Sequence, residues 1–435
     1  MRVGLKILYS FYCSLFVFFE INCHNQNQIQ DFKVELIPAD TFIFRSFVDC
    51  NMATAWVGDT FRIFPGKYGE DPVWGPAHDL KFANGANADE TFNTPFGSFS
   101  EPLMPAVAAT NENGLHGAVW FETVYQDKND ASGKTLFALY HNENYPQTLP
   151  YNAATGQGYK NINWPFGINT DTSPAAVPRI GIMKSLDGGH SWENKGIILE
   201  DLQDRMILSP DNNAKSFGGG NGDPSAIACG DYLYIFYSEY GYPGKYDPKT
   251  YNPEKEHQGQ CISVARLALA DLNNPQGKAK RWNGKAFESS YTDFGQPIKE
   301  FVIPSAEGGG PTSTFQADFY WGPSVSWNAY LNAWVMLMAK TEDSSWVGHS
   351  IYISFNTNKD LGLNDNSQQW SKPQLLYRKE GHTLWYPSLQ PLNTKEDINL
   401  KRTCLNLGQE ARLFFKDLQR DKYLSEFKVR FSKKN

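Results

Sequence analysis

The sequence predicts an all-β fold, a single β-propeller of five four-stranded blades. Three observations predict it: strand-like runs throughout the chain, a strand start that recurs with further strands between its copies, and one hairpin motif typical of propeller blades. Long amphipathic helical patterns are missing. We expect the propeller to extend from residue 32 to residue 431, because no low-complexity or Pro/Ser-rich linker divides this part of the chain.

The strand-like runs are rich in aromatic and β-branched residues, which favour pleated and partly buried backbone. Turn signals such as Gly230-Asp231 and Asp187-Gly188 separate them. The expected strands are 118–124, 135–140, 179–185, 232–237, 261–269, 333–339, 350–355 and 411–415.

The recurring strand start is a Pro-Ser pair followed by an apolar residue. It occurs at Pro224-Ser225, Pro323-Ser324 and Pro387-Ser388. Proline is tolerated at the beginning of a strand, where its missing N–H costs no ladder hydrogen bond. We therefore expect three equivalent strands, each the first of a blade. Segments 48–56 and 117–124 look like two more first strands, which makes five blades.

Residues 185–192 fit the Asp-box pattern S-x-D-x-G-x-[ST]-W. In this β-hairpin turn the aspartate, here Asp187, caps the turn backbone, and the tryptophan, here Trp192, packs beneath it. In propellers the box joins the third and fourth strands of a blade. We expect a structural role for Asp187 and not a catalytic one.

Residues 1–23 have the pattern of a signal peptide. Arg2 and Lys6 lie before a run of 13 uncharged residues, 7–19, and polar residues follow from Glu20 onward. This run is too short for a membrane span, which needs about 18 or more apolar residues, and no later apolar stretch reaches that length. We expect a secreted protein with no membrane span in the mature chain; the alternative is a buried N-terminal strand or helix.

The mature chain is mildly acidic. The full sequence has a net charge of −7, and loss of residues 1–23 makes it −8. Binding to nucleic acid requires a clustered basic face, whereas the basic runs at 278–281 and 433–434 are short. This composition argues against a nucleic-acid partner, and the sequence specifies no oligomeric state.

Four cysteines remain in the mature chain: Cys50, Cys229, Cys261 and Cys404. They form no CxxC pair and have no histidine at zinc-finger spacing, so no metal site is predicted from them and the cofactor is left unknown. Cys229 and Cys261 are expected at opposite ends of one blade, beyond disulfide reach. Cys50 and Cys404 lie in blades that meet when the ring closes, which makes them the one plausible bridge; four free thiols are the alternative.

Several segments resemble a largely bacterial family of secreted five-bladed propellers, labelled sialidase-like or glycosyl hydrolase. The resemblance covers about residues 49–431 and implies a five-bladed propeller that acts on or binds carbohydrate. At the level of fold the chain is similar to arabinanase, invertase and related furanosidase propellers. The segments are Val48-Asp49-Cys50-Asn51, Tyr140-His141-Asn142-Glu143, Pro178-Arg179-Ile180-Gly181, Gly219-Gly220-Asn221-Gly222-Asp223 and Trp321-Gly322-Pro323-Ser324-Val325-Ser326-Trp327-Asn328.

One face of the propeller is expected to carry the site. Strands alternate in direction, so first-strand starts, second-strand ends and third-strand starts share a face. The two longest inter-strand segments, 144–178 and 240–259, decorate the same face, as loops do where a scaffold carries function. The side chains expected there are Asp49, Asp223, Trp321, Trp385, His141, Glu143, Glu239 and Arg179.

Carboxylates and aromatic rings around a funnel suit the cleavage of a glycosidic bond. One acid protonates the leaving oxygen, and a second carboxylate activates water or attacks the anomeric carbon. Asp49 and Asp223 are the candidate pair, because they match by position the acidic first-strand starts of the similar furanosidases. Those enzymes use a glutamate acid where this chain has Asp223, so Glu122 or Glu143 would take the acid role.

Structural alternatives exist for each of these residues. Asp223 can cap a neighbouring loop, Trp321 and Trp385 can pack between blades, and Arg179 can form a structural pair. His141 can bind substrate or a metal, although a satisfied histidine is the more common outcome.

The leading functional hypothesis is a glycoside hydrolase or lyase acting on a glycan outside the cell. The alternative is a lectin-like propeller that binds carbohydrate without catalysis. A true sialidase is less favoured: Phe61-Arg62-Ile63-Phe64-Pro65 resembles the F/Y-R-I-P element with one residue inserted, but no arginine triad can be assembled.

Overall fold

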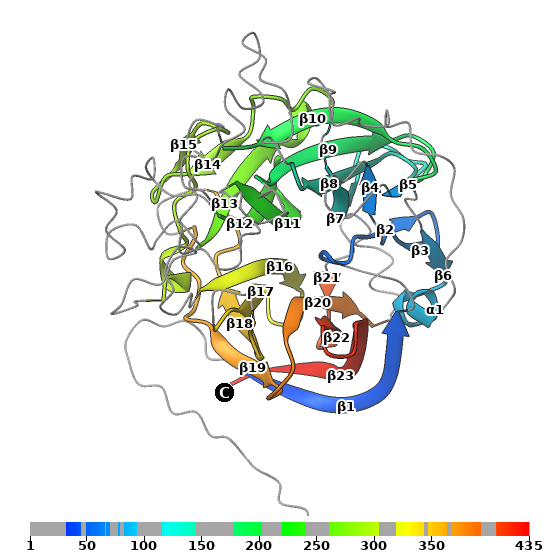
Figure 1. Cartoon of the computed structure of the whole chain (residues 1–435), viewed down its shortest axis with the longest axis vertical. Coiled ribbons are helices and arrows are strands. Elements are labelled where there is room, and N and C mark those ends of the chain that lie inside the picture. The colour runs from blue at the N-terminus through cyan, green and yellow to red at the C-terminus, as the bar shows by residue number, and fades with distance from the viewer. Residues whose placement is uncertain are drawn as a thin grey trace, which may run out of the picture.

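The computed structural model describes residues 32–44, 49–65, 67–69, 77–78, 82–93, 115, 117–144, 177–201, 220–240, 261–303, 319–342, 347–362, 367–392 and 406–434. Their strands form five sheets around a central axis, so the predicted five-bladed β-propeller is confirmed (Figure 1). The helix α1 (Ala88–Asn93) and two 3-10 turns, Leu269–Asp271 and Lys299–Phe301, are short. Within the described ranges no helix is both long and apolar enough to cross a membrane.

Each blade is one sheet, antiparallel except for one added strand in blade four, and three of the five carry strands beyond the expected four. Blade one contains β2 (Thr54–Val57), β3 (Thr60–Ile63) and β6 (Ala83–Gly85). Blade two contains β7 (Val119–Gln126), β8 (Leu136–Asn142), β9 (Arg179–Ser185) and β10 (Glu193–Leu199), and β4 (Lys67–Gly69) and β5 (Ala77–His78) extend it beyond β7. Blade three contains β11 (Asn221–Cys229), β12 (Tyr232–Glu239), β13 (Cys261–Ala268), β14 (Lys280–Trp282) and β15 (Phe287–Ser289). Blade four contains β16 (Tyr320–Asn328), β17 (Ala333–Lys340), β18 (Ser350–Asn356) and β19 (Gln374–Arg378), with β21 (Asn406–Leu407) added parallel to β16.

Blade five closes the ring with strands from both ends of the chain. It contains β20 (Leu384–Pro391), β22 (Glu410–Asp417), β23 (Lys422–Lys433) and β1 (Phe32–Phe44). β1 pairs antiparallel with β23 from Phe32 opposite Lys433 to Phe44 opposite Tyr423 (Figure 1). The long N-terminal strand thereby ties the ends of the chain together, which the sequence did not predict.

The first strands β2, β7, β11, β16 and β20 contact one another around the axis, as expected. Every Pro-Ser repeat coincides with a β-bulge. The register with the second strand shifts between Gly222 and Ser225 in β11, and the same shift recurs at Ser324 and Ser388. The residue before each proline has a left-handed backbone, with φ of 50° at Asp223, 56° at Gly322 and 48° at Tyr386. The repeat therefore marks a bulge that bends each of these strands at the same point.

The serines of the repeat also link neighbouring blades. The Oγ of Ser225 accepts the backbone N–H of Val325 at 3.0 Å, from β11 to β16. Thr123 occupies the corresponding place in β7, where its Oγ1 accepts the N–H of Ala226 at 3.2 Å. A narrow cavity runs along the axis of the propeller. The hydroxyl-bearing residues that line it are Thr54, Thr123, Ser225, Ser324 and Ser388. Blade packing at the axis therefore depends on side-chain hydrogen bonds as well as apolar contact.

The Asp-box segment forms the turn between β9 and β10, at the end of blade two opposite the first-strand starts. Asp187 Oδ1 accepts the N–H groups of His190 and Ser191 at 2.9 and 3.0 Å, and Trp192 is buried beneath. Arg62 donates to the carbonyl of Gly188 in this turn. The arginine of the F/Y-R-I-P-like segment therefore stabilises the turn and does not reach the expected substrate face.

The predicted Cys50–Cys404 disulfide is wrong, because Cys50 is a free thiol, as are Cys229 and Cys261. Cys50 is fully buried in an apolar cluster that includes Phe44, Met52 and Trp56. Burial raises the pKa of the Cys50 thiol well above its usual range, so the reactive thiolate is suppressed. Cys404 and the predicted signal peptide, residues 1–23, lie outside the described residues.

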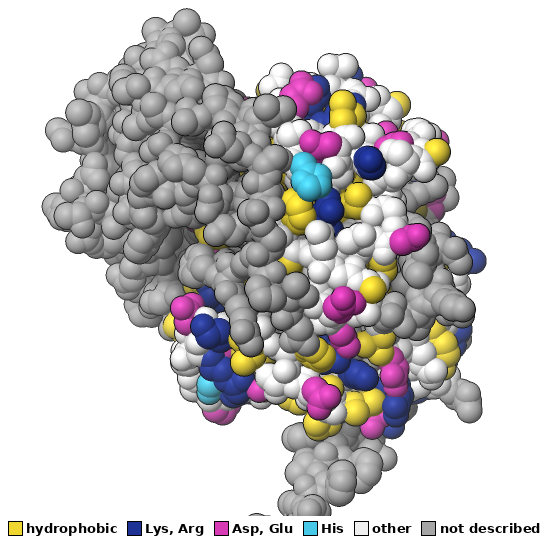
Figure 2. Space-filling view, turned by 90° about the vertical axis from the view of Figure 1, so that its right-hand side faces the viewer, with side chains coloured by type: hydrophobic (Ala, Val, Ile, Leu, Met, Phe, Trp, Pro, Cys, Tyr) yellow, Lys and Arg dark blue, Asp and Glu magenta, His cyan; other side chains and the backbone are white. Residues whose placement is uncertain are grey.

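Acidic and basic side chains are interspersed on the described surface seen from the side of blades one and two (Figure 2). Opposite charges at short separation partly cancel, so this surface presents mixed charge and not a field of one sign.

We expect Ser225→Ala to lower the free energy of unfolding by about 1 to 3 kcal/mol, because the buried N–H of Val325 loses its acceptor. Chemical denaturation measures the change. Ser289→Ala on the outer strand β15 controls for the substitution itself. A Ser225→Ala effect within about 0.5 kcal/mol of that control would contradict the role of the hydroxyl as a link between blades.

Asp187 gives a prediction for the pH dependence of stability. Burial acts to raise the pKa of Asp187, but hydrogen bonds from Ser191, Ser185 and His190 outweigh it and lower the pKa to about 2. A lowered pKa in the folded state stabilises the fold above about pH 4, and this stabilisation is lost as the pH falls toward about 2. Asp187→Asn should thus cost about 1 kcal/mol at neutral pH, allowing for solvent exposure, and less in acid.

Unfolding titrations at several pH values test this prediction. Asp231→Asn, in the exposed hairpin between β11 and β12, is the matched control and should change stability little. A loss in Asp187→Asn that stays constant from pH 6 to about pH 2 would contradict the account.

Candidate functional site

Seven polar and aromatic side chains gather at the axis, near the first-strand starts. We call them the axial cluster. Its members are Asp49, Glu122, His141, Asp223, Tyr240, Tyr386 and Lys416.

Glu122 lies at a bulge in β7, where the register shifts between Phe121 and Thr123. Its side chain lines the axial cavity and is buried, and its Oε2 accepts the N–H of Asn51 at 2.6 Å. Burial, followed by the nearby charge of Asp223, raises the pKa of Glu122 well above its usual range. Glu122 is therefore a carboxyl group that resists ionisation unless a positive charge approaches.

His141 stands between two carboxyl groups. Its Nδ1 lies 3.5 Å from Asp223 Oδ1 and 3.9 Å from Glu122 Oε1. The backbone N–H of Asp223 donates to the same Nδ1 at 3.3 Å. The second oxygen of Asp223, Oδ2, accepts a hydrogen bond from the Tyr240 hydroxyl. Blades two and three thus meet at His141, whose ring lies against both the side chain and the backbone N–H of Asp223.

Asp49 is the accessible carboxyl of the cluster. Its side chain is 31% exposed, and it accepts a hydrogen bond from Lys416 Nζ at 2.9 Å. Burial raises the pKa of Asp49, whereas the Lys416 cation opposes the rise. The raised pKa favours a protonated Asp49, which can give its proton to a ligand. Once Asp49 is ionised, the Lys416 cation lies beside the carboxylate.

Aromatic rings adjoin the carboxyl groups. Trp321 is buried and packs edge-to-face against Trp385 and Tyr386, at centroid distances of 5.5 and 5.3 Å. Burial and the charges of Asp223, Asp49 and Glu122 raise the pKa of Tyr386 well above its usual range, which places its phenol near all three. Trp385 is only half-buried, and Lys416 Nζ lies 6.0 Å from its ring centroid. Of the two predicted tryptophans, Trp385 is the one that offers a ring surface beside Asp49 and Lys416.

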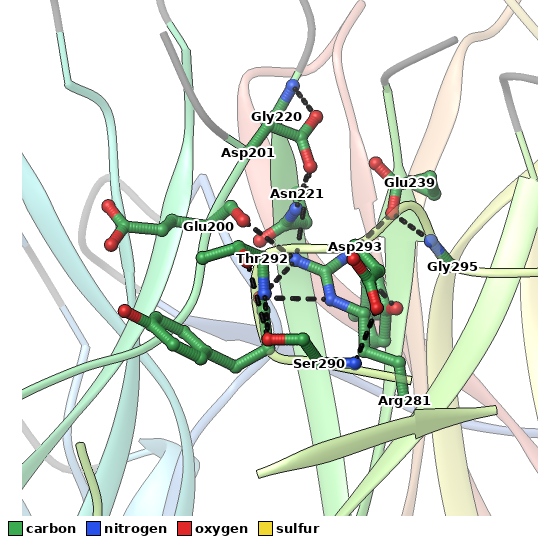
Figure 3. Close-up of polar contacts among 12 residues, drawn as sticks. Glu200, Asp201, Gly220, Asn221, Glu239, Arg281, Ser290, Thr292, Asp293 and Gly295 are labelled. Carbon is green, nitrogen blue, oxygen red and sulfur yellow. Dashed lines mark hydrogen bonds and ion pairs between the residues drawn. The ribbon is translucent and has the colours of Figure 1, made fainter. Parts of the chain in front are cut away.

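Two predicted site residues, Glu239 and Arg179, have their partners outside the axial cluster. Glu239 is buried and pairs with Arg281 at 2.8 Å, while Gly295 N–H donates to the same oxygen at 3.0 Å (Figure 3). Arg179 donates to Asn142 Oδ1 at 2.8 Å. Glu143, half-buried, follows β8. The structure thus brings Asp49, Glu122, His141 and Asp223 together with Trp385 close by, and it directs Glu239 and Arg179 into local structural pairs.

The sequence reasoning missed three members of the cluster. Tyr386 had a usable signal, because it stands before Pro387 at the same place in the repeat as Asp223 before Pro224. Tyr240 follows a strand end without any motif. Lys416 is a cation in the buried strand β22, and a buried lysine usually has a partner. Nothing in the sequence identifies Asp49 as that partner.

Glu122, His141 and Asp223 are also residue types that ligate metal ions. One oxygen of each carboxylate and one ring nitrogen lie within 4.8 Å of one another, and all three residues are buried. Carboxylate and imidazole groups at such separations can surround a single cation.

No protein-family model and no curated protein sequence matches the chain. Similar solved structures include an α-L-arabinanase of Cellvibrio cellulosa, at 12% identity and a TM-score of 0.44 over 88% of this chain and 91% of that one. An α-L-arabinofuranosidase from Lactobacillus brevis shows 10% identity and a TM-score of 0.45 over 91% and 94%. A Penicillium chrysogenum α-L-arabinanase complexed with arabinobiose shows 11% identity and a TM-score of 0.43 over 92% and 98%. The resemblance to arabinanase and furanosidase propellers expected from the sequence reappears here, at a level that assigns no substrate to this chain.

A double-mutant cycle tests the pairing of Asp49 with Lys416. We expect Asp49→Asn and Lys416→Met to be coupled by about 1 to 3 kcal/mol in the free energy of unfolding, because the hydrogen bond is charge-assisted and the lysine is buried. The more exposed pair Asp271 and Lys278, 2.8 Å apart, is the matched control and should show less than about 1 kcal/mol. If the losses of unfolding free energy in the two single variants simply add up in the double variant, the contact between Asp49 and Lys416 does not organise the site.

Proposed function

We propose that the chain is a secreted glycosidase-like enzyme that cleaves a glycosidic bond at the axial cluster, with Asp49 and Asp223 as its carboxylate pair. One observation carries the proposal: a partly exposed carboxyl of raised pKa, Asp49, lies beside a half-buried tryptophan, Trp385, with a second carboxyl behind it. Glycoside hydrolysis requires a proton donor and a second carboxylate next to a bound sugar ring.

Asp49 is the proposed proton donor. A donor must hold its proton near the working pH and must reach the leaving oxygen. Both Asp49 and Glu122 have a raised pKa, but Asp49 reaches a ligand better, because its side chain is partly exposed whereas Glu122 is buried. Lys416 then stabilises the carboxylate that remains after proton transfer. The half-buried Glu143 is the other candidate donor.

Asp223 is the proposed second carboxylate. Tyr240 holds one of its oxygens, and the other faces His141, so its orientation is fixed before a sugar binds. Glu122 and Asp223 do not form the catalytic pair with each other, because one oxygen of Glu122 lies within 4.8 Å of one oxygen of Asp223. Two carboxyl groups so close leave no room for an anomeric carbon between them, which requires about 5 Å or more.

The charge of the cluster favours a neutral sugar. Three carboxyl groups face one lysine and one histidine, and a sugar acid would add a further negative charge. Within the described residues, Arg62, Arg179 and Arg281 all donate to groups outside the cluster. Among the described residues no arginine therefore faces the cluster to bind the carboxylate of a sialic acid, and we propose a neutral glycan substrate.

A lectin-like propeller is the second candidate, and one observation favours it. The Asp223 side chain is only 2% exposed, so a ligand that rests on Trp385 and Asp49 need not reach a second carboxylate. Binding without turnover would then be the function of the same surface.

The proposed site of action is outside the cell. The charged start, the uncharged run 7–19 and the polar residues after it support export. Appearance of full-length chain in the cytosolic fraction, without cleavage near residue 23, would contradict this part of the proposal.

Turnover of neutral chromogenic glycosides and polysaccharides by the mature protein tests the function. We expect Asp49→Asn and Asp223→Asn to lower kcat by about 100-fold or more, because each removes a group that acts in the transition state. Asp187→Asn, on the opposite face, is the matched control and should retain activity. Sugar binding without turnover would favour the lectin-like function. Unchanged turnover in both variants would contradict the assignment of Asp49 and Asp223 as the carboxylate pair.

A further inference from the structure

We propose that Asp201, supported by Arg281, is a positioning residue for Asp223, the second carboxylate of the proposed reaction. Neither Asp201 nor Arg281 belongs to the axial cluster, and the sequence analysis singled out neither of them. The inference rests on the proposed function for the role of Asp223, but the contacts that hold this side chain in place can be tested without a substrate.

Arg281 is completely buried, and its guanidinium joins three segments of the chain (Figure 3). It donates to Glu239 Oε2 at 2.8 Å, to the carbonyl of Glu200 at 3.1 Å and to the carbonyl of Tyr291 at 2.8 Å. These partners lie at the end of β12, after β10 and after β15. A planar guanidinium with several fixed donors thus sets the positions of segments from blades two and three relative to one another.

Asp201 connects this buried cation to the start of β11. Its side chain is only 3% exposed, and its Oδ1 lies 3.8 Å from Arg281 Nη2. Its Oδ2 accepts the backbone N–H of Gly220 at 2.9 Å, and its Oδ1 accepts the side-chain amide of Asn221 at 3.1 Å (Figure 3). One carboxylate therefore holds both backbone and side chain where the strand begins, and the nearby cation offsets the cost of burying its charge.

Asn221 is the first residue of β11 and lies two residues before Asp223. It is completely buried, and its backbone N–H donates to the carbonyl of Pro178 at 2.9 Å. Among the described residues its Oδ1 has no hydrogen-bond partner, so the side-chain amide is held by its bond to Asp201. The start of β11 is thus tied to blade two through both Pro178 and Asp201.

The same carboxylate reaches Asp223 by a second route. Gly220, whose N–H bonds to Asp201, accepts the backbone N–H of Tyr240 at 2.7 Å. The Tyr240 hydroxyl in turn donates to Asp223 Oδ2. Gly220 itself has a left-handed φ of 94°, and a Cβ there would lie 2.5 Å from the carbonyl oxygen of Pro178. This junction therefore accepts glycine and little else.

Asp223 needs such support because its backbone is strained. Its φ of 50° is left-handed and its side chain is buried, and a conformation of this kind persists only where the surrounding contacts over-determine it. The contacts of Asp201 fix the chain just before Asp223 and the neighbouring strand end that carries Tyr240. We therefore expect loss of the Asp201 carboxylate to relax the start of β11 and to separate Asp223 from the Tyr240 hydroxyl.

A double-mutant cycle tests the positioning without a substrate. In the wild type, Tyr240→Phe should raise the unfolding equilibrium constant by about tenfold, because Asp223 loses a buried hydrogen bond. In the Asp201→Asn background the same change should raise it by about threefold or less, since the two groups are already apart. Asp89→Asn, which breaks the pair with Arg412 between α1 and β22, is the matched background and should preserve the tenfold effect.

Turnover provides the second measurement, because it separates positioning from a general loss of stability. Asp201→Asn should lower kcat by about tenfold or more and change KM by less than about threefold, since the sugar still meets Trp385 and Asp49. Asn221→Ala removes one link to Asp201 without changing a charge, so it should lower kcat in the same way even if Asp201→Asn fails to fold. Asp89→Asn should leave kcat and KM unchanged.

The proposal is overturned if Tyr240→Phe costs the same in the wild type, in Asp201→Asn and in Asn221→Ala. It is equally overturned if Asp223→Asn abolishes turnover while Asp201→Asn and Asn221→Ala retain the kcat of the wild type. A wild type that cleaves no glycoside contradicts the proposed function, and the double-mutant cycle then still decides whether Asp201 positions Asp223.

Discussion

The burial of three carboxyl groups at the propeller axis is the constraint on which the site depends. Asp49, Glu122 and Asp223 influence one another electrostatically, and removal of charge from water is costly at each of them. The propeller architecture imposes this crowding, because the blades direct their first strands toward one axis. The protein offsets it with the cation of Lys416, the hydroxyl of Tyr240 and the N–H of Asn51.

The Pro-Ser repeat connects this electrostatic site to the fold. The residue before each proline adopts a left-handed backbone, which is strained for Asp223 and Tyr386 and free of strain for Gly322. Both strained residues belong to the axial cluster. Ser225, two residues beyond Asp223, fixes the next blade through Val325. The same bulge therefore sets the spacing of the blades and holds functional side chains in a conformation that an unconstrained chain would avoid.

Local patterns predicted most of the fold. The repeat located three first strands, the Asp-box pattern located the turn after β9, and strand direction placed Asp49, His141 and Asp223 at one end of the molecule. Contacts between residues that lie far apart in the sequence were not predictable. The pairing of β1 with β23, of Glu239 with Arg281 and of Asp49 with Lys416 each depends on how the ring closes or how a blade folds back. Cys50 shows the same limit, because the expected closeness of two blades does not predict whether a thiol is bonded, and Cys50 is free.

The central claim is that the axial cluster, and not another surface of the propeller, binds a sugar ring beside Asp49. A crystal structure of the Asp49→Asn variant soaked with the neutral oligosaccharide that binds best tests it most directly. The account predicts a sugar ring against Trp385, with a glycosidic oxygen within hydrogen-bond distance of residue 49. A sugar bound only on the Asp-box face, or between the outer strands of two blades, would contradict it.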